Sequence, residues 1–363
     1  MINRKSHTPL YIQLADTLRE QIRSGDIQPG SKLPSETEMI RQYNLGRLTI
    51  REALSILANE GLIEKHHGKG TFCKTNALPT KYKIDVLLNL TDIYFIPHYL
   101  QSICSVLEQN NAGVILRDTK NNVDNICGLL EKILAEGSDG ILIQPSPDAL
   151  CPPEKLVQLF QKLIAAGIPY IMIDSAYTSV PHSYAIMDEF NAGVLAANHF
   201  TELGHKSLCM IAIKGYADSE LRMEGFAKSL NIPPYRIDYS ADLYGSISAM
   251  RKERPDITGL FCHNDEIARE CYEILGQLSL SVPDDISIIS VDDTVIASTL
   301  TPPLTSIVHP KGLLGKASAQ ALIAIISGDA RWPYRKVFEP TLSVRNSCRV
   351  LTCSAESPQT SES

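Results

Sequence analysis

Residues 34–54 read Pro34-Ser-Glu-Thr-Glu-Met-Ile-Arg-Gln-Tyr-Asn-Leu-Gly-Arg-Leu-Thr-Ile-Arg-Glu-Ala-Leu54, and this stretch predicts two short helices joined by a turn. Ser35-Glu-Thr-Glu38 is a capping box, in which the Ser35 hydroxyl and the Glu38 carboxylate satisfy free backbone N–H groups at a helix start. Asn44-Leu-Gly46 supplies the turn. Apolar residues then recur at helical spacing, which predicts a second helix that buries Ile50, Ala53, Leu54 and Leu57.

The segments on either side of this stretch extend the pattern to a winged helix. Four earlier apolar residues fall on one helical stripe: Tyr11, Leu14, Leu18 and Ile22. After the second helix, residues 62–72 read as two short strands around His67-Gly-Lys-Gly70. A helix, a helix–turn–helix and a wing together predict a winged helix–turn–helix domain of the α+β class at residues 1–73.

The second helix exposes polar side chains near its N-terminus, where a recognition helix meets base edges in the major groove. Arg47 and Arg51 suit this role because a guanidinium can bond guanine O6 and N7 together, and Thr49 offers a hydroxyl or a methyl contact. In the wing, Gly68 allows close approach to phosphates and Lys69 adds positive charge. The alternative is that the arginines lie on a merely solvated helix face, and the surrounding motif disfavours it.

Four motifs in order resemble the DNA-binding domain of the GntR family. They are Pro9-Leu-Tyr-Ile-Gln-Leu14, Pro29-Gly-Ser-Lys-Leu-Pro-Ser-Glu36, Arg47-Leu-Thr-Ile-Arg-Glu-Ala-Leu54 and Gly68-Lys-Gly-Thr-Phe72. The resemblance covers residues 8–73 and implies double-stranded operator DNA as a partner. Gly46 stands where the family often has Ser, and Leu48 stands at a commonly polar position. The predicted DNA-binding residues are Glu36, Arg47, Leu48, Thr49, Arg51, His67, Gly68 and Lys69.

Charge is divided unevenly along the chain. Residues 1–76 contain 11 Lys and Arg against 8 Asp and Glu, whereas the remainder contains 23 against 33. A basic region ahead of an acidic one fits a region that meets an anionic partner. The nine cysteines are scattered without a C-x-x-C pair, which favours reduced thiols and a cytoplasmic location. No signal peptide and no membrane-crossing segment are expected.

After a short polar linker at residues 74–82, apolar runs alternate with helix-length segments. Such alternation predicts parallel sheets with helices on both faces, and residues 83–353 are enough for two lobes of this α/β kind. In such folds ligands bind at the carboxyl ends of strands, in the cleft between lobes. The strands are predicted at residues 84–90, 114–116, 140–143, 170–173, 208–213, 259–261 and 286–291.

Polar residues follow several of these predicted strands, among them Gln144, Asp174, Asn264 and Asp292. Carboxylates, amides and the guanidinium of Arg222 would bond sugar hydroxyls. Aromatic faces for stacking are offered by Tyr94, Phe95, Tyr177 and Tyr244. For any single residue the alternative is a loop cap or an exposed turn. Several in register at strand ends favour a shared site, and the residues by themselves indicate only a small polar ligand.

This region resembles the LacI/GalR effector domain, which is similar to periplasmic sugar-binding proteins. The motifs include Ile168-Pro-Tyr-Ile-Met-Ile-Asp174, Arg222-Met-Glu-Gly-Phe226, Asn264-Asp-Glu-Ile-Ala268 and Val282-Pro-Asp-Asp-Ile-Ser287. The resemblance gives ligand roles to Asp174, Arg222, Asn264 and Asp292. Ser290-Val291 departs from the family's usual Gly and aromatic residue, which would remove a stacking surface. The predicted ligand-binding residues are Tyr94, Phe95, Asp174, Arg222, Tyr244, Asn264 and Asp292.

A GntR-type domain ahead of a LacI/GalR-type domain is similar to the arabinose-responsive repressors, and stretches such as Asp92-Ile-Tyr-Phe-Ile-Pro97 strengthen that likeness. The resemblance implies L-arabinose or a close pentose as the effector and no cofactor. One winged helix makes few base contacts, so a homodimer on a palindromic operator is expected. Sugar binding is expected to lower operator affinity. Residues 354–363 lack apolar side chains and are predicted to be a disordered tail.

Two other classes of protein share part of this pattern. A sugar-binding transport protein would share the two-lobed region, but the winged helix and the lack of a signal peptide disfavour it. A sugar-modifying enzyme would need a catalytic motif, and the sequence contains no G-x-S-x-G elbow, P-loop or H-E-x-x-H motif. The sequence therefore predicts a transcription regulator and not an enzyme.

Overall fold

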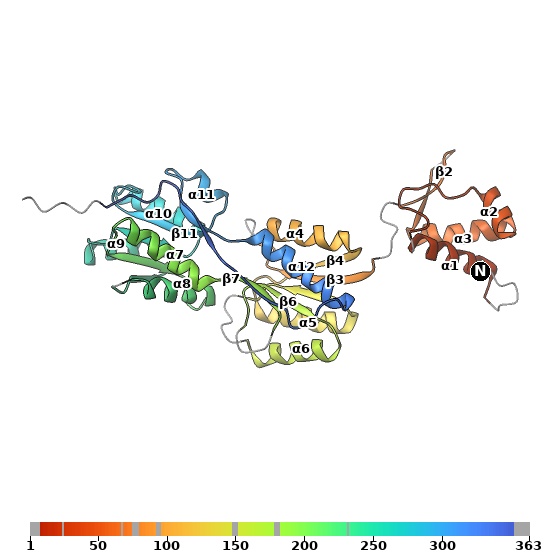
Figure 1. Ribbon diagram of the computed structural model, residues 1–363, viewed down its shortest axis with the longest axis horizontal. Helices are drawn as coiled ribbons and strands as arrows, with labels where there is room; N and C mark the ends of the chain where they lie inside the picture. The colour runs from red at the N-terminus through yellow and green to blue at the C-terminus, as the bar shows by residue number, and fades with distance from the viewer. Residues whose placement is uncertain are drawn as a thin grey trace, which may run out of the picture. The chain divides into compact units, whose positions relative to one another are not determined.

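The computed structural model describes residues 8–23, 25–66, 68–74, 80–91, 96–146, 152–177, 182–230 and 232–351 (Figure 1). The described chain forms two compact units. The first holds the N-terminal residues up to Lys81, together with Asn111–Gly113, and the second holds the remainder from Tyr82.

The first unit is a winged helix–turn–helix, as the sequence predicted. Its elements are α1 (Leu10–Arg23), α2 (Glu36–Tyr43), α3 (Arg47–Asn59), β1 (Ile63–His66) and β2 (Gly70–Cys73). β1 and β2 pair antiparallel with Ile63 opposite Cys73, and they form the wing. The three helices and the wing close over a common core that includes Leu14, Leu18, Ile22, Met39, Ile50, Leu54, Leu57 and Ile63.

Capping fixes where α2 and α3 begin. The Ser35 Oγ accepts a hydrogen bond from the Glu38 N–H at 3.3 Å, and the Glu38 Oε2 accepts from the Ser35 N–H at 2.7 Å, which is the predicted capping box. Asn44 ends α2 in the left-handed region with φ 52°. Gly46 is the N-cap residue of α3. Because glycine has no side chain, it cannot accept hydrogen bonds from the first N–H groups of the helix.

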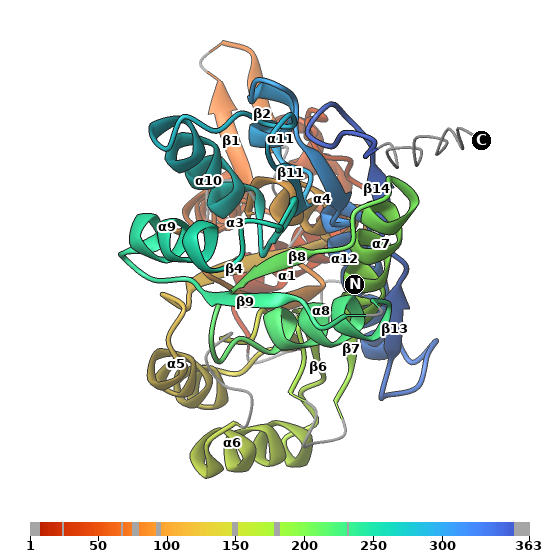
Figure 2. The same cartoon turned by 90° about the vertical axis from the view of Figure 1, so that its left-hand side faces the viewer.

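The second unit consists of two α/β lobes. The first lobe has a six-stranded sheet in the order β13-β7-β6-β5-β3-β4, with α4 and α12 over one face and α5 and α6 over the other (Figures 1 and 2). Its elements are β3 (Tyr82–Leu88), α4 (Ile96–Gln109), β4 (Ala112–Asp118), α5 (Val123–Glu136), β5 (Gly140–Ile143), α6 (Glu154–Ala165), β6 (Tyr170–Asp174), β7 (Tyr184–Met187), α12 (Lys311–Ser327) and β13 (Arg335–Phe338).

The second lobe repeats this plan with a sheet in the order β14-β12-β11-β10-β8-β9. α7 and α8 pack on one face of the sheet, and α9 and α10 pack on the other. Its elements are α7 (Glu189–Glu202), β8 (Leu208–Ala212), α8 (Ala217–Lys228), β9 (Tyr235–Asp238), α9 (Leu243–Glu253), β10 (Gly259–Cys262), α10 (Asp265–Gln277), β11 (Ser287–Asp292), α11 (Val295–Thr299), β12 (Thr305–Val308) and β14 (Thr341–Ser343).

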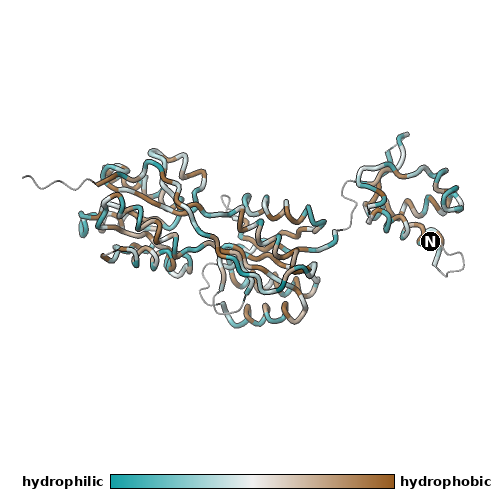
Figure 3. The backbone as a smooth tube through the Cα atoms, viewed as in Figure 1, coloured by the Kyte–Doolittle hydropathy of each residue, from teal (hydrophilic) through white to brown (hydrophobic). Residues whose placement is uncertain are grey.

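The central strands of both sheets pair in parallel, and β14 joins β12 antiparallel. The central strands β5, β6, β8 and β10 consist almost entirely of hydrophobic residues, because helices cover both faces of the sheets (Figure 3). The chain crosses between the lobes after β7, after β12 and between β13 and β14. Parallel pairing brings the carboxyl ends of the strands in each lobe to a single edge. Among the described residues, no helix is long and apolar enough to span a membrane.

Candidate functional site

The first unit presents the N-terminus of α3 on its surface. Arg47 and Arg51 are exposed, Thr49 is half-buried, and the Leu48 side chain is 73% exposed. Glu36, at the first position of α2, pairs with Arg51 at 3.0 Å between Oε2 and Nε. The structure therefore places these five predicted DNA-binding residues at the starts of two adjacent helices.

The wing carries two further predicted contacts. Gly68 and Lys69 are exposed at the turn between β1 and β2, and His67 lies outside the described residues. Lys32 was not among the predicted DNA-binding residues, although it is exposed. Its side chain lies against Gly70, because a Cβ added to Gly70 would come within 2.6 Å of Lys32 Cε. A backbone bridge between Lys32 and Phe72 holds it there, so Lys32 adds a cation to Lys65 and Lys69 of the wing.

A cavity of about 180 Å³ lies between the two lobes at the carboxyl ends of their strands. This volume is more than ten times the roughly 10–15 Å³ that one water molecule needs. A larger cavity of about 530 Å³ lies elsewhere, under the C-terminal ends of α6 and α12, and Ile164, Ile325 and Trp332 contribute to its lining. The strand-end cavity has the denser polar lining: Asn89, Asn121, Gln144, Pro145, Asp174, Ser175, Ile213, Tyr216, Asp218, Arg222, His263, Asn264, Asp292 and His309.

Asp174 ends β6 and is held on every side in the cavity wall. Its Oδ1 accepts from the Tyr99 hydroxyl at 2.9 Å and pairs with His309 Nε2 at 3.0 Å, and its Oδ2 accepts from Gln144 Nε2 at 2.9 Å. Burial by itself would raise the pKa of this carboxyl, but these partners, His309 foremost, lower the pKa to about 2. Asp174 is therefore an oriented anion that can accept hydrogen bonds from ligand hydroxyls.

Arg222 of α8 is the buried cation of the cavity. Its Nε donates to Glu189 Oε2 at 2.5 Å, and its Nη1 donates to the His263 carbonyl at 2.6 Å. Desolvation opposes the charged form, but the carboxylate of Glu189 outweighs it and raises the pKa of Arg222. Burial and this same guanidinium lower the pKa of His263, which therefore stays neutral. Arg222 keeps donors for a ligand oxygen in a direction fixed by two protein partners.

Asp292 ends β11 and lines the cavity from the second lobe. Burial raises the pKa of its carboxyl well above the ordinary value, although Lys311 and Arg222 act against this. Lys311 Nζ donates to the Asp292 carbonyl oxygen. Asp218 lies nearby, and burial together with the Glu189 charge raises its pKa as well. The cavity thus combines one carboxyl whose pKa is lowered, Asp174, with two whose pKa is raised, Asp292 and Asp218.

The remaining predicted ligand residues fall into three groups. Asn264 lines the cavity, and its Oδ1 also caps α10 by accepting from the Ile267 N–H at 2.9 Å. Tyr94 and Phe95 lie outside the described residues. The assignment of Tyr244 is corrected, because this residue is 46% exposed on α9 and is absent from the cavity lining. An aromatic side chain that does line the cavity is Tyr216, which precedes α8.

Three lining residues at strand ends were missed: of these only His263 follows a predicted strand, because Asn89 fell inside the strand predicted at residues 84–90 and no strand was predicted before His309. Asn89 follows β3, His263 follows β10 and His309 follows β12. They occupy the same strand-end positions as Gln144 and Asp292. Tyr216 and Asp218 come from the loop and first turn of α8, for which no strand-end signal exists.

Known proteins match both units. Residues 10–73 match the family model of bacterial regulatory proteins of the gntR family, and residues 197–348 match that of the periplasmic binding protein-like domain. An arabinose metabolism transcriptional repressor from Geobacillus stearothermophilus is 30% identical over 369 residues, which cover 94% of this chain and 98% of that protein. The chain belongs to this family of transcriptional repressors. The repressor of the same name from Halalkalibacterium halodurans is 27% identical over 364 residues, covering 93% and 96%.

The two-lobed region of this repressor also matches solved structures. A LacI family transcriptional regulator from Enterococcus faecalis V583, with bound ribose, superposes with a TM-score of 0.64 at 25% identity and covers 74% of this chain and all of the other. The resemblance to GntR and LacI/GalR proteins, the fold class and the prediction of a repressor in place of an enzyme are confirmed.

Proposed function

We propose that this repressor binds operator DNA upstream of genes for L-arabinose utilisation and is released when L-arabinose occupies the cavity between its lobes. The polar lining of that cavity is the observation that carries the sugar assignment. Asp174 supplies a fixed acceptor, Arg222 a fixed donor, and Gln144 and Asn264 amide groups. Tyr216 adds an aromatic face. A small polyol satisfies this set, because each hydroxyl can both donate and accept.

Arabinose is favoured over other sugars by two similar proteins whose names state arabinose metabolism. The cavity volume of about 180 Å³ is below the usual range for drug-sized ligands, about 300–1,000 Å³, which favours a small effector. Ribose is the competing pentose, because the similar Enterococcus faecalis regulator was solved with ribose bound. Both sugars offer the same number of hydroxyls, so stereochemistry at the cavity wall decides between them.

The DNA contacts are assigned to the surface at the starts of α2 and α3. Arg47, Leu48 and Thr49 enter the major groove, while Arg51, held by Glu36, reaches a base edge or a phosphate. The wing residues His67, Gly68 and Lys69 approach the backbone of the duplex. In this proposal residues 1–73 read DNA, residues 74–82 link, and residues 83–353 bind sugar and pair two chains on a palindromic site.

Release requires that sugar favour a state with weak DNA affinity. For ordinary coupling between two sites this preference amounts to about 1–3 kcal/mol, which weakens operator binding by about 5- to 150-fold. The sugar contacts residues of both lobes, so its binding energy favours one interlobe geometry over the others. That geometry then sets how a homodimer presents its two winged helices.

The test combines calorimetry with DNA binding. Palindromic duplexes selected from a random pool serve as the operator, and the free protein is titrated with L-arabinose, D-ribose, D-xylose and D-glucose. We expect L-arabinose to bind most tightly and to weaken operator binding. Tighter binding of another sugar reassigns the effector, and an operator affinity unchanged by every sugar refutes sugar-dependent release.

Two substitutions separate the two roles. Arg222→Ala should abolish the sugar response and spare DNA binding, whereas Arg51→Ala should do the reverse. Arg236→Ala is the matched control, since this arginine pairs with Glu220 on the surface and does not line the cavity. It should change neither property.

A further inference from the structure

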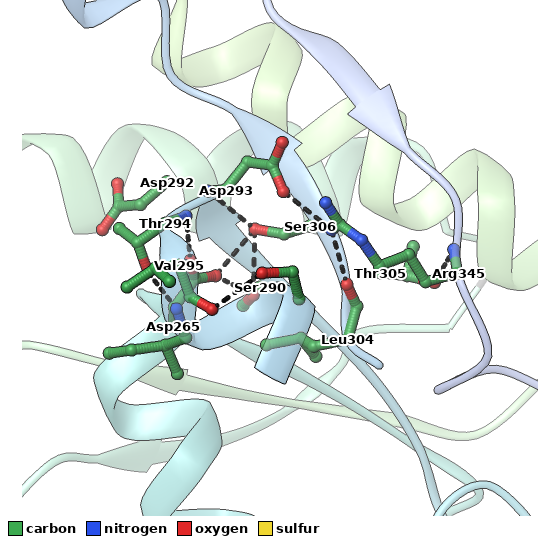
Figure 4. A network of polar contacts seen from close by, with 12 residues as sticks. Asp265, Ser290, Asp292, Asp293, Thr294, Val295, Leu304, Thr305, Ser306 and Arg345 are labelled. Carbon is green, nitrogen blue, oxygen red and sulfur yellow. Dashed lines mark hydrogen bonds and ion pairs between the residues drawn. The ribbon is translucent and has the colours of Figure 1, made fainter. Parts of the chain in front are cut away.

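The Asp292 carboxyl differs from Asp174 and Arg222, the two oriented groups of the cavity. Asp174 is oriented by three side chains, and Arg222 is oriented by Glu189 and the His263 carbonyl. Within the described part of the chain, by contrast, no side chain or backbone group bonds to the Asp292 carboxylate (Figure 4). Its direction therefore depends on how its own backbone is held.

That backbone is strained. Asp292 has φ 113° and Asp293 has φ 48°, both in the region that favours glycine. Each such residue costs about 1–3 kcal/mol and persists only where the surroundings over-determine the conformation. Two adjacent residues of this kind need a strong anchor, and the structure shows one.

The anchor is Asp265, the first residue of α10, which is 1% exposed. Its Oδ1 accepts from the hydroxyls of Ser290 and Ser306, the latter at 2.7 Å. Its Oδ2 accepts from the Thr294 N–H at 2.6 Å and from the Thr294 hydroxyl at 2.8 Å. Ser290 lies two residues before Asp292 and Thr294 lies two residues after it. One buried carboxylate therefore holds both ends of the strained pair (Figure 4).

Further contacts hold Asp293 itself. Its N–H donates to Ser306 Oγ at 3.1 Å, and its carboxylate pairs with Arg345 at 2.7 Å. Arg345 Nη1 also donates to the Leu304 carbonyl at 2.8 Å. The N–H and the carboxylate of Asp293 are therefore both held by other protein groups. Asp292 is the member of the pair that lines the cavity (Figure 4).

We infer that Asp265 is a positioning residue for sugar binding: through Ser290, Ser306 and Thr294 it fixes the Asp292 backbone and so the direction in which Asp292 meets the sugar. This inference rests on the proposed sugar-binding function. Asp265 is not among the residues that line the cavity. It acts only through Asp292.

A double-mutant cycle tests this route, because two residues that act through one contact are not additive. Asp265→Asn keeps the size of the side chain but removes acceptor capacity. We expect it to weaken L-arabinose binding about ten- to hundredfold, the range for hydrogen bonds to a charged group. In the Asp292→Ala background the same substitution should cause no further loss. An undiminished loss in that background would overturn the inference.

Two substitutions at Thr294 change the structure less than Asp265→Asn and test the inference even if the Asp265 variant misfolds. Thr294→Val removes the hydroxyl and should weaken sugar binding, whereas Thr294→Ser keeps it and should bind like the unmodified protein. Asp285→Asn is the matched control, because Asp285 likewise accepts from the backbone N–H and hydroxyl of one residue, Ser281, but on an exposed turn. It should leave sugar affinity unchanged.

Operator binding and the thermal midpoint are measured in parallel on the full-length protein. Both should stay near the unmodified values for the Thr294 variants. If Thr294→Val binds sugar normally, the positioning role is refuted while the sugar-binding function stands. If the unmodified protein binds no sugar of the panel, the proposed function fails, and this inference fails with it.

Discussion

Arg222 Nε and Glu189 Oε2 lie 2.5 Å apart, and the two side chains are 5% and 4% exposed. The pair joins α8 to the first residue of α7 and aims the guanidinium into the cavity. A buried ion pair is costly to break, because the remaining charge stays desolvated without its partner. The Glu189–Arg222 pair is therefore both a structural element and part of the binding site.

We predict that Glu189→Gln lowers the free energy of unfolding by about 3–5 kcal/mol, the usual cost of removing one partner of a buried pair. The measurement is urea unfolding followed by far-UV circular dichroism. Glu220→Gln, which breaks the exposed Arg236–Glu220 pair, should cost about 1 kcal/mol or less. If both variants lost the same free energy of unfolding, burial would not make the Glu189–Arg222 pair more important for stability than the exposed pair, and the prediction would be wrong.

Gly225 allows α7 and α8 to pack closely enough for this pair to form. A Cβ at Gly225 would lie 1.9 Å from the backbone oxygen of Phe190, so Gly225→Ala must push the helices apart. We predict a loss of about 1–3 kcal/mol in stability and weaker sugar binding, since Arg222 lies one turn away on α8. Urea unfolding and calorimetry measure the two effects.

Gly128→Ala is the matched control for this prediction. Gly128 lies inside α5 with open space around its Cβ position, so alanine should stabilise the protein by about 0.5–1 kcal/mol. A similar gain for Gly225→Ala would show that the α7–α8 contact is looser than the structure indicates.

The sequence predicted the strands whose apolar residues are buried on both faces of the sheet. It missed strands that are mostly exposed. The strands predicted at residues 140–143 and 259–261 correspond to β5 and β10, which are fully buried. β9 and β13 are mostly exposed, and they carry no continuous apolar run. β12 was missed for a different reason: Thr305 and Ser306 are buried, but their hydroxyls bond Arg345 and Asp265.

The candidate site was partly predictable for a related reason. Asp174, Asn264 and Asp292 follow strands, and chain order alone places them at the sheet edge. Tyr244 was chosen as an aromatic without such a constraint, and α9 carries it away from the cavity. Ser290 was expected only to remove a stacking surface, whereas its hydroxyl bonds to Asp265. A contact between residues 25 positions apart leaves no local pattern in the sequence.

Leu48 provides a test of DNA recognition that is free of folding effects. Its side chain is 73% exposed, so Leu48→Ser should change the unfolding free energy by no more than about 0.5 kcal/mol. Operator affinity should nevertheless fall by about 1–3 kcal/mol if Leu48 makes an apolar contact with a base. Fluorescence anisotropy with labelled duplex measures this loss.

Leu313, which is 58% exposed on α12 of the second unit, is the control for Leu48. Leu313→Ser should leave the affinity of the protein for operator DNA unchanged. Equal operator affinity for Leu48→Ser and the unmodified protein would remove Leu48 from the reading surface.

His182 predicts how stability depends on pH. It is 1% exposed with Nδ1 2.7 Å from the Tyr170 hydroxyl, and burial, with a smaller effect of Arg335, lowers its pKa to about 4. The unfolded chain protonates this group near 6.5, so between about pH 6.5 and 4 the unfolded state binds more protons. Stability is therefore lost as the pH falls through this window, at up to about 1.4 kcal/mol per pH unit from this one histidine.

His182→Asn keeps a polar partner for Tyr170 but cannot take up the proton, so the slope of unfolding free energy against pH should decrease. Trp332, the sole tryptophan of the chain, packs against Tyr170 at 6.0 Å between ring centroids and reports unfolding of this lobe by fluorescence. His66→Asn, in the other compact unit, should leave the Trp332-detected slope unchanged. A slope in His182→Asn equal to that of the unmodified protein would contradict the assignment, because the other buried histidines of the described chain, His205, His263 and His309, are present in both.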